Sequence, residues 1–153
     1  MTMKLVFDGT PTTCISTTGT ITNGTFTVDS TNATITQFDN STDLWPSARC
    51  TLSIVDTFSA APTDGSTIDL YMCRDDIDGT LDEVAPTTSD QQGATYVGSF
   101  RLYAADVNQP KEVDVSLAGV KKCRFFFQNN SGVSISYSAG NTLKVEGFSY
   151  QDV

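Results

Sequence analysis

Turn-forming residues interrupt this sequence every eight to twelve residues or so, and almost no helical periodicity connects them. Between the interruptions, apolar and polar residues alternate. The clearest case follows Pro46, where four residues at every second position would share one face: Ala48, Cys50, Leu52 and Ile54. Because side chains alternate across a strand, this pattern predicts β-strands with one buried face.

The alternating segments give eight to ten expected strands. They lie at 3–7, 20–22, 25–28, 35–38, 48–55, 67–73, 95–104, 111–117, 121–128 and 141–150. Asn23-Gly24 is the dipeptide most favoured in two-residue hairpin turns, so it predicts pairing between 20–22 and 25–28. Further turns are expected at 8–11, 62–65, 129–132 and 138–141, and a long acidic loop at 74–94.

Parallel strands need crossover connections, and no segment is a helix long enough to provide one. The predicted fold is therefore all-β: an antiparallel double-sheet sandwich with jelly-roll-like or Greek-key connections, with a closed barrel as the alternative. A length of 153 residues suits one domain over 1–153.

Threonine dominates residues 1–42. Apolar residues such as Ile21, Phe26 and Ile35 recur there regularly enough to predict strands and not a disordered linker. Large apolar residues are nevertheless few, so we expect an arm-like N-terminal portion that pairs with a neighbouring molecule.

The formal net charge is −9, from 18 acidic and 9 basic residues. Binding to nucleic acid needs clustered basic residues, and anionic membranes repel an acidic chain. The one dense basic run is Lys121-Lys122-Cys123-Arg124, which strand alternation would divide between two faces. We therefore expect no nucleic-acid partner and no membrane partner. Residues 1–7 lack the features of a signal peptide, which predicts synthesis in a cytoplasm.

Four cysteines are scattered at positions 14, 50, 73 and 123, and the chain contains no histidine. This spacing does not fit a zinc site, and in a reducing cytoplasm such cysteines are expected to be buried thiols. Without histidine, the usual catalytic triads cannot form, and no glycine-rich phosphate loop is present. Paired carboxylates remain able to hydrolyse glycosides, but most acidic residues lie in turns. We expect no catalytic residues, no cofactor and no enzymatic activity.

Two segments are candidate binding sites, the acidic run 74–83 and the segment around Trp45. The acidic run 74–83 has the spacing Asp76-x-Asp78-Gly79, but a calcium loop aligned on it places Arg74 and Ala85 at ligand positions. A solvated loop is the preferred interpretation, so no metal ligand is assigned. A looser calcium site is the alternative, with four ligands: Asp75, Asp76, Asp78 and Asp82.

The single tryptophan, Trp45, is expected to pack on the core. An exposed platform for stacking a sugar is the alternative interpretation.

The second half of the chain carries a succession of strand and turn segments: 68–72, 78–80, 96–100, 111–117, 125–132 and 140–145. Over residues 66–148 this pattern resembles small structural proteins of tailed-phage virions, of the type that decorates or cements capsids. The resemblance implies a β-sandwich located in the virion. Its partners would be the major capsid protein or other virion proteins, and it would form a homo-oligomer, with a trimer expected. The alternatives are a tail, neck or fibre component, or a carbohydrate-binding module.

Overall fold

The computed structural model describes residues 3–7, 10–54, 58–75, 83–104, 110–136 and 140–152. Ten strands lie in this part of the chain: β1 (Met3–Phe7), β2 (Thr12–Thr17), β3 (Ala33–Ile35), β4 (Phe38–Asp39), β5 (Ser47–Ser53), β6 (Thr67–Arg74), β7 (Thr95–Arg101), β8 (Lys111–Ser116), β9 (Lys122–Asn130) and β10 (Thr142–Asp152). Residues 8–9 and 138–139 of two expected turns, and residues 76–82 of the expected acidic loop, lie outside the described residues.

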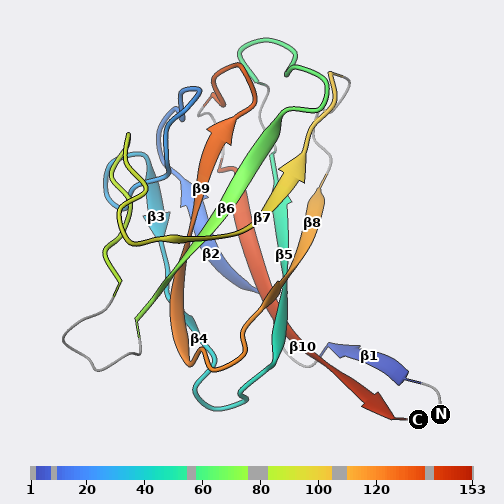
Figure 1. Ribbon diagram of the computed structural model, residues 1–153. Coiled ribbons are helices and arrows are strands. Elements are labelled where there is room, and N and C mark those ends of the chain that lie inside the picture. The colour runs from blue at the N-terminus through green and yellow to red at the C-terminus, as the bar shows by residue number, and fades with distance from the viewer. Residues whose placement is uncertain are drawn as a thin grey trace.

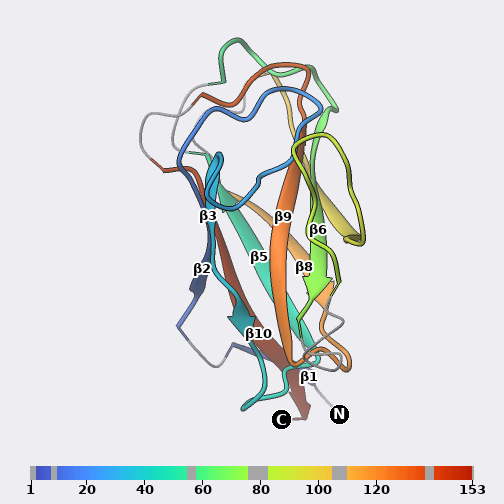
Figure 2. The ribbon, with the colours of Figure 1, turned by 90° about the vertical axis from the view of Figure 1, so that its left-hand side faces the viewer.

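The strands form two antiparallel sheets packed face to face, which Figure 2 shows side on. One sheet has the order β3-β2-β10-β5-β8, with β1 added to the end of β10, and the other has the order β4-β9-β6-β7. The prediction of an antiparallel double-sheet sandwich is therefore confirmed (Figure 1).

The connections are those of a jelly roll. Strands β6 and β7 pair as neighbours in sequence, and outward from them β5 pairs with β8, β4 with β9, and β2 with β10. The chain is thus a long hairpin whose two arms are wrapped so that successive strand pairs alternate between the two sheets. This arrangement of eight strands in two four-stranded sheets defines the jelly-roll architecture. Strands β1 and β3 are additions to the sheet that contains β2.

The main core lies between the sheets. In β5 the predicted inward residues Ala48, Cys50 and Leu52 are fully buried, while the residues between them are partly exposed. Phe125 and Phe127 of β9 enter the same core from the opposite sheet. The alternation predicted from the sequence therefore gives the inner faces correctly.

The outer face of the sheet containing β6 and β9 is buried as well. Tyr71, Cys73 and Phe126 point away from the main core and form a second apolar cluster with Phe26 and Ala94. The Phe26 ring meets the Tyr71 ring edge-on at 5.2 Å, and the Phe26 amide donates to the Thr88 carbonyl at 3.0 Å. Because two loops cover this sheet, its strands contain continuous apolar runs instead of strict alternation.

The hairpin predicted at Asn23-Gly24 is wrong. The turn itself forms, with Gly24 at a φ of 81° and the Thr25 amide donating to the Thr22 carbonyl. Its flanks, however, pair with distant segments, since Ile21 bridges Ile135 and Phe26 bridges Gln128. These long-range pairings bury both apolar side chains.

The turn predicted at 129–132 begins later than expected, because Asn129 and Asn130 complete β9. The Asn129 side chain is fully buried and donates to the carbonyls of Ile21 at 2.9 Å and Val133 at 2.8 Å. Asparagine is a turn former when its amide bonds locally. Here its Oδ1 makes such a local bond, accepting from the Ser131 amide at 3.1 Å, while its Nδ2 also holds the distant segment at Ile21.

Residues 10–42 do not form an arm, because β2 and β3 belong to one sheet and β4 to the other. The threonine-rich composition concealed strand β2, which has no expected counterpart. Two threonine hydroxyls of this region accept hydrogen bonds from backbone amides inside the protein. Thr17 Oγ1, at the end of β2, accepts from the Asn141 amide at 3.2 Å, and Thr27 Oγ1, in the loop that follows, accepts from the Phe127 amide at 3.0 Å. Threonine is therefore part of the buried structure, and not only of its surface.

This burial predicts that a chain beginning at residue 43 does not fold. It loses Ile15, Ile21 and Phe26, which are fully buried and together contribute roughly 5–9 kcal/mol, comparable with the whole stability of a domain. A chain beginning at Thr10 lacks only β1, which pairs with β10 alone, and is the matched control that should fold. Near-ultraviolet circular dichroism and thermal unfolding test both. A cooperative transition in the shorter chain would contradict the prediction.

Candidate functional site

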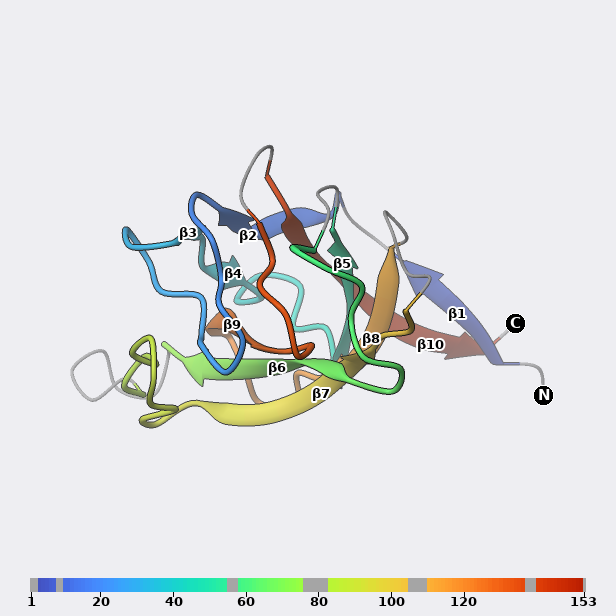
Figure 3. The ribbon, with the colours of Figure 1, turned by 90° about the horizontal axis from the view of Figure 1, so that it is seen from above.

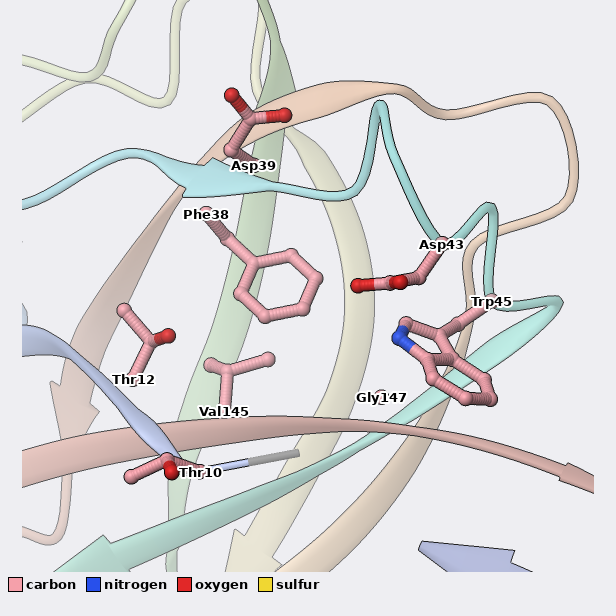
Figure 4. A pocket seen from close by; sticks show the side chains of 8 residues that line it. All are labelled: Thr10, Thr12, Phe38, Asp39, Asp43, Trp45, Val145 and Gly147. Carbon is pink, nitrogen blue, oxygen red and sulfur yellow. The ribbon is translucent and has the colours of Figure 1, made fainter. Parts of the chain in front are cut away.

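A pocket of about 150 Å³ opens between β10 and the loop that joins β4 to β5. Figure 4 shows the residues that line it: Thr10, Thr12, Phe38, Asp39, Asp43, Trp45, Val145 and Gly147. Phe38 and Val145 are buried core residues and give the pocket an apolar floor. The threonines and aspartates make its rim polar. Its volume suits one small group, such as a single sugar ring.

One buried amide fixes Trp45 at this pocket. The Asn40 side chain is 1% exposed, and its Oδ1 accepts from the Trp45 amide at 2.8 Å. Its Nδ2 donates to the carbonyls of Trp45 and Val120, each at 3.0 Å. Both backbone polar groups of Trp45 are therefore held by one side chain, which the Val120 carbonyl anchors to the segment before β9.

Gly147 leaves the space that the Trp45 indole occupies. A Cβ at position 147 would overlap the Cδ1 and Cγ atoms of the indole, so no larger residue fits with the ring in place. Trp45 is half-buried and packs against the main core, which confirms the sequence prediction. The pocket on its other side was not predictable, because Gly147 lies a hundred residues further along the chain.

The polar groups of the pocket have different surroundings. In Figure 4 the indole nitrogen and the Asp43 carboxylate point into the pocket, whereas the Asp39 carboxylate points away from it. Hydrogen bonds from Ser41 lower the pKa of Asp39, and the ammonium of Lys122, 3.8 Å away, lowers it further. Within the described part of the chain the indole N–H has no hydrogen-bond acceptor. An inward donor beside an inward acceptor suits a neutral polar ligand that can both accept and donate.

The acidic loop gives no metal site in the described structure. Asp76–Asp82 lie outside the described residues. The Asp75 side chain is almost fully buried and accepts from Arg124 Nη2 at 2.7 Å and Gln37 Nε2 at 3.0 Å. Its oxygens thus serve an ion pair, and no group of three or more metal-binding side chains occurs among the described residues.

The basic run is divided as predicted. Cys123 is buried in the core, while Lys122 and Arg124 lie on the opposite face of β9. Each basic side chain there contacts a carboxylate, Lys122 that of Asp39 and Arg124 that of Asp75. These two side chains are therefore neutralised within the protein.

All four cysteines lie within the described residues and are buried, and no disulfide joins any two of them. This agrees with the expectation of buried thiols. Burial raises the pKa of Cys14 to about 12 and that of Cys73 to about 11, and it raises the pKa of Cys50 as well. Such thiols are poor nucleophiles near neutral pH.

A second surface was missed by the sequence analysis. Strand β1 and residues 148–152 of β10 form a two-stranded ribbon that projects from the sandwich and ends at both termini (Figures 1 and 3). Its register places five apolar side chains on one face, and we call them the apolar strip: Met3, Leu5, Phe7, Phe148 and Tyr150.

The apolar strip is ordered by ring contacts and yet widely exposed. Phe148 is buried, with its ring centroid 5.5 Å from that of Phe7 and 5.9 Å from that of Tyr150. The Arg49 guanidinium lies 4.9 Å from the Phe7 ring centroid and also pairs with Asp114. Met3 is 64% exposed, Tyr150 57% and Phe7 36%. The alternation in residues 3–7 predicted a strand there, but the sequence did not indicate that β10 is the strand that pairs with it.

Comparisons of this chain with known protein families, with curated proteins and with solved structures find no match. Among the described residues no helix has the length and apolar character needed to cross a membrane.

The raised thiol pKa values predict a loss of stability in alkali. Between pH ~9 and ~12 the native Cys14 stays protonated while the unfolded thiol ionises, so the free energy of unfolding falls as pH rises, by about 1.4 kcal/mol per pH unit and thiol. Urea unfolding across this range measures the slope. Cys14→Ala should remove one thiol's share of it. An unchanged slope in that variant would contradict the assignment.

The Trp45–Gly147 contact predicts that Gly147→Ala displaces the indole. The added methyl overlaps the ring, so we expect a red-shifted emission of the single tryptophan and a destabilisation of about 1–3 kcal/mol. Fluorescence and chemical unfolding measure the two effects. Ser149→Ala, two residues along the same strand face, is the control and should change neither. Wild-type emission from Gly147→Ala would refute the contact.

Proposed function

We propose that this chain is a non-enzymatic structural protein of a tailed-phage virion, which decorates or cements the capsid shell through protein–protein contacts. The resemblance over residues 66–148 suggests this class. The observation that carries the proposal is the apolar strip on the projecting ribbon.

The ribbon has the properties of a surface that another protein covers. A two-stranded ribbon without further strands is marginally stable in water, and exposed contiguous apolar groups mark interaction sites. Here Met3 and Tyr150 keep more than half of their surface exposed. Covering them would remove apolar area from water and also fix the ribbon in place. Assembly into a larger particle supplies such a covering partner.

The pocket at Trp45 favours a second candidate, a carbohydrate-binding module of a tail or fibre. Jelly rolls occur in both viral capsid proteins and lectins, so the fold is compatible with either function and selects neither. The observation specific to this candidate is the inward indole N–H beside the Asp43 carboxylate, over an apolar floor. We rank it second because the pocket holds only one small group.

Quantitative binding to capsid shells tests the proposal. Purified shells of the phage that encodes the chain should bind wild-type protein at a fixed number of copies per capsomer. Leu5→Lys should lower this occupancy, because it places a charge within the apolar strip. Exposed Val84→Lys, far from the ribbon in sequence and outside the strip, is the control.

Full occupancy by the Leu5→Lys variant would show that the apolar strip is not the contact with the shell. The decoration role itself would be contradicted by detection of the protein only at the tail of intact virions, or by glycan binding that Trp45→Ala abolishes. The last result would support the carbohydrate-binding candidate instead.

A further inference from the structure

A described segment covers one part of the outer face of the sheet β4-β9-β6-β7. Figure 1 looks onto this face, where the segment that leads into β7 crosses in front of β9 and β6 and contributes Ala94 to the second apolar cluster. Next to this cluster on the same face, the register places Asp69 of β6 between Gln128 of β9 and Ser99 of β7. All three residues are partly exposed, so this part of the face presents polar side chains.

A chain of hydrogen bonds fixes these side chains. The Asp69 carboxylate accepts from Ser99 Oγ at 2.6 Å and from Asn130 Nδ2 at 2.8 Å. Because the single hydroxyl hydrogen of Ser99 goes to Asp69, the Tyr96 hydroxyl, 2.7 Å from Ser99 Oγ, is the donor in that pair. Asn130 Nδ2 also donates to Gln128 Oε1 at 3.1 Å. Side chains from three adjacent strands are thus held in one arrangement.

After these bonds are made, the groups left over are mainly acceptors. Each Asp69 oxygen accepts one of these bonds, from a neutral donor, and keeps a further lone pair. Both hydrogens of the Asn130 amide are used, so its Oδ1 is the group that remains. The Tyr96 hydroxyl donates to Ser99 and can still accept. Because Asp69, Asn130 and Tyr96 all retain exposure to solvent, a ligand that reaches them must bring hydrogen-bond donors.

Tyr96 adds an ordered aromatic ring to this row. The residue is 53% exposed, and its ring centroid lies 5.7 Å from that of Tyr71, with the two rings edge to face. Its hydrogen bond to Ser99, three residues further along β7, aligns the side chain with the strand. The ring is held in place before any ligand arrives, so little side-chain freedom is lost on binding. We call this surface the tyrosine platform, and it comprises Asp69, Tyr96, Ser99, Gln128 and Asn130.

We propose that the tyrosine platform binds a neutral sugar residue of a glycan. The C–H face of the sugar ring packs on the Tyr96 ring, and the sugar hydroxyls donate to the oxygens of Asp69 and Asn130. This binding activity goes beyond attachment to a shell. It uses neither the apolar strip nor the pocket at Trp45.

Other ligand classes match the platform less well. A phosphate or carboxylate group would be repelled by the Asp69 charge and by the net charge of −9. An apolar surface placed here would remove the acceptors from water without replacing their hydrogen bonds. A lysine side chain would bring one charged group to acceptors that lie on three strands. A sugar ring carries several hydroxyls beside an apolar face, and so matches both parts of the platform.

A glycan array that carries neutral, sialylated and amino-sugar glycans tests the proposal. Wild type should bind neutral glycans, and this binding should persist at high salt because the ligand is uncharged. Tyr96→Ala removes the ring and Asp69→Asn removes the charged acceptor, so each should weaken binding at least about tenfold. Tyr96→Phe keeps the ring and should bind more tightly than Tyr96→Ala.

The matched controls make the same kinds of change outside the platform. Tyr150→Ala alters a tyrosine that is 57% exposed on the ribbon, and Glu112→Gln alters a carboxylate that is 55% exposed on β8. Both should bind glycans as wild type does. Circular dichroism verifies that every variant folds.

Four results would overturn the proposal. They are no binding of neutral glycans by wild type, equal effects of the platform and control variants, binding confined to amino-sugar glycans and abolished by salt, and binding that Trp45→Ala removes while Tyr96→Ala does not. The third would make the platform a cation site, and the fourth would place the glycan in the pocket. Wild type that binds shells but no glycan would refute this proposal alone, whereas wild type that binds glycans at the platform but no shell would refute the proposed function alone.

Discussion

The structure depends on hydrogen bonding between the two halves of the chain. Apart from β3, each described strand before residue 75 pairs with at least one strand after residue 94, and the sequence separation grows from the β6–β7 pair to the β1–β10 pair. Neither half can bury its own apolar faces, because the main core is closed only when both sheets contain strands from both halves. Such a topology has many non-local contacts, and its loop-closure entropy must be overcome before the core stabilises it.

The same pairing produces the surface features of the molecule. Pairing of the first strand with the last brings both termini to one place and extends β10 beyond the sandwich as the ribbon. Gly147 and Phe148 mark the transition, because β5 ends its pairing with β10 there. Gly147 lies under the Trp45 indole on the inner face, and Phe148 lies under Phe7 on the outer face. The pocket and the apolar strip are therefore neighbours on opposite faces of one strand.

The polar chemistry of the interior is structural. Asn40, Asn129 and Thr27 use buried side chains to satisfy backbone groups of distant segments, as buried polar groups must. Arg49 and Arg124 are paired with Asp114 and Asp75 on the sheet surfaces. These interactions fix loops and strand ends in position.

The sequence by itself determined the all-β class, the inner face of β5 and the burial of Cys50 and Cys123, because each depends on period-two alternation within a short segment. It did not determine the partners of each strand, since alternation carries no information about which distant segment completes a sheet. For that reason Asn23-Gly24 suggested a local hairpin, and residues 10–42 resembled an arm although their threonines bond the backbone of the second half. The pocket needs Trp45 and Gly147 brought together, and the ribbon needs residues 3–7 placed beside 148–152. Only the tertiary structure decided these, because both arise from contacts between residues more than a hundred positions apart.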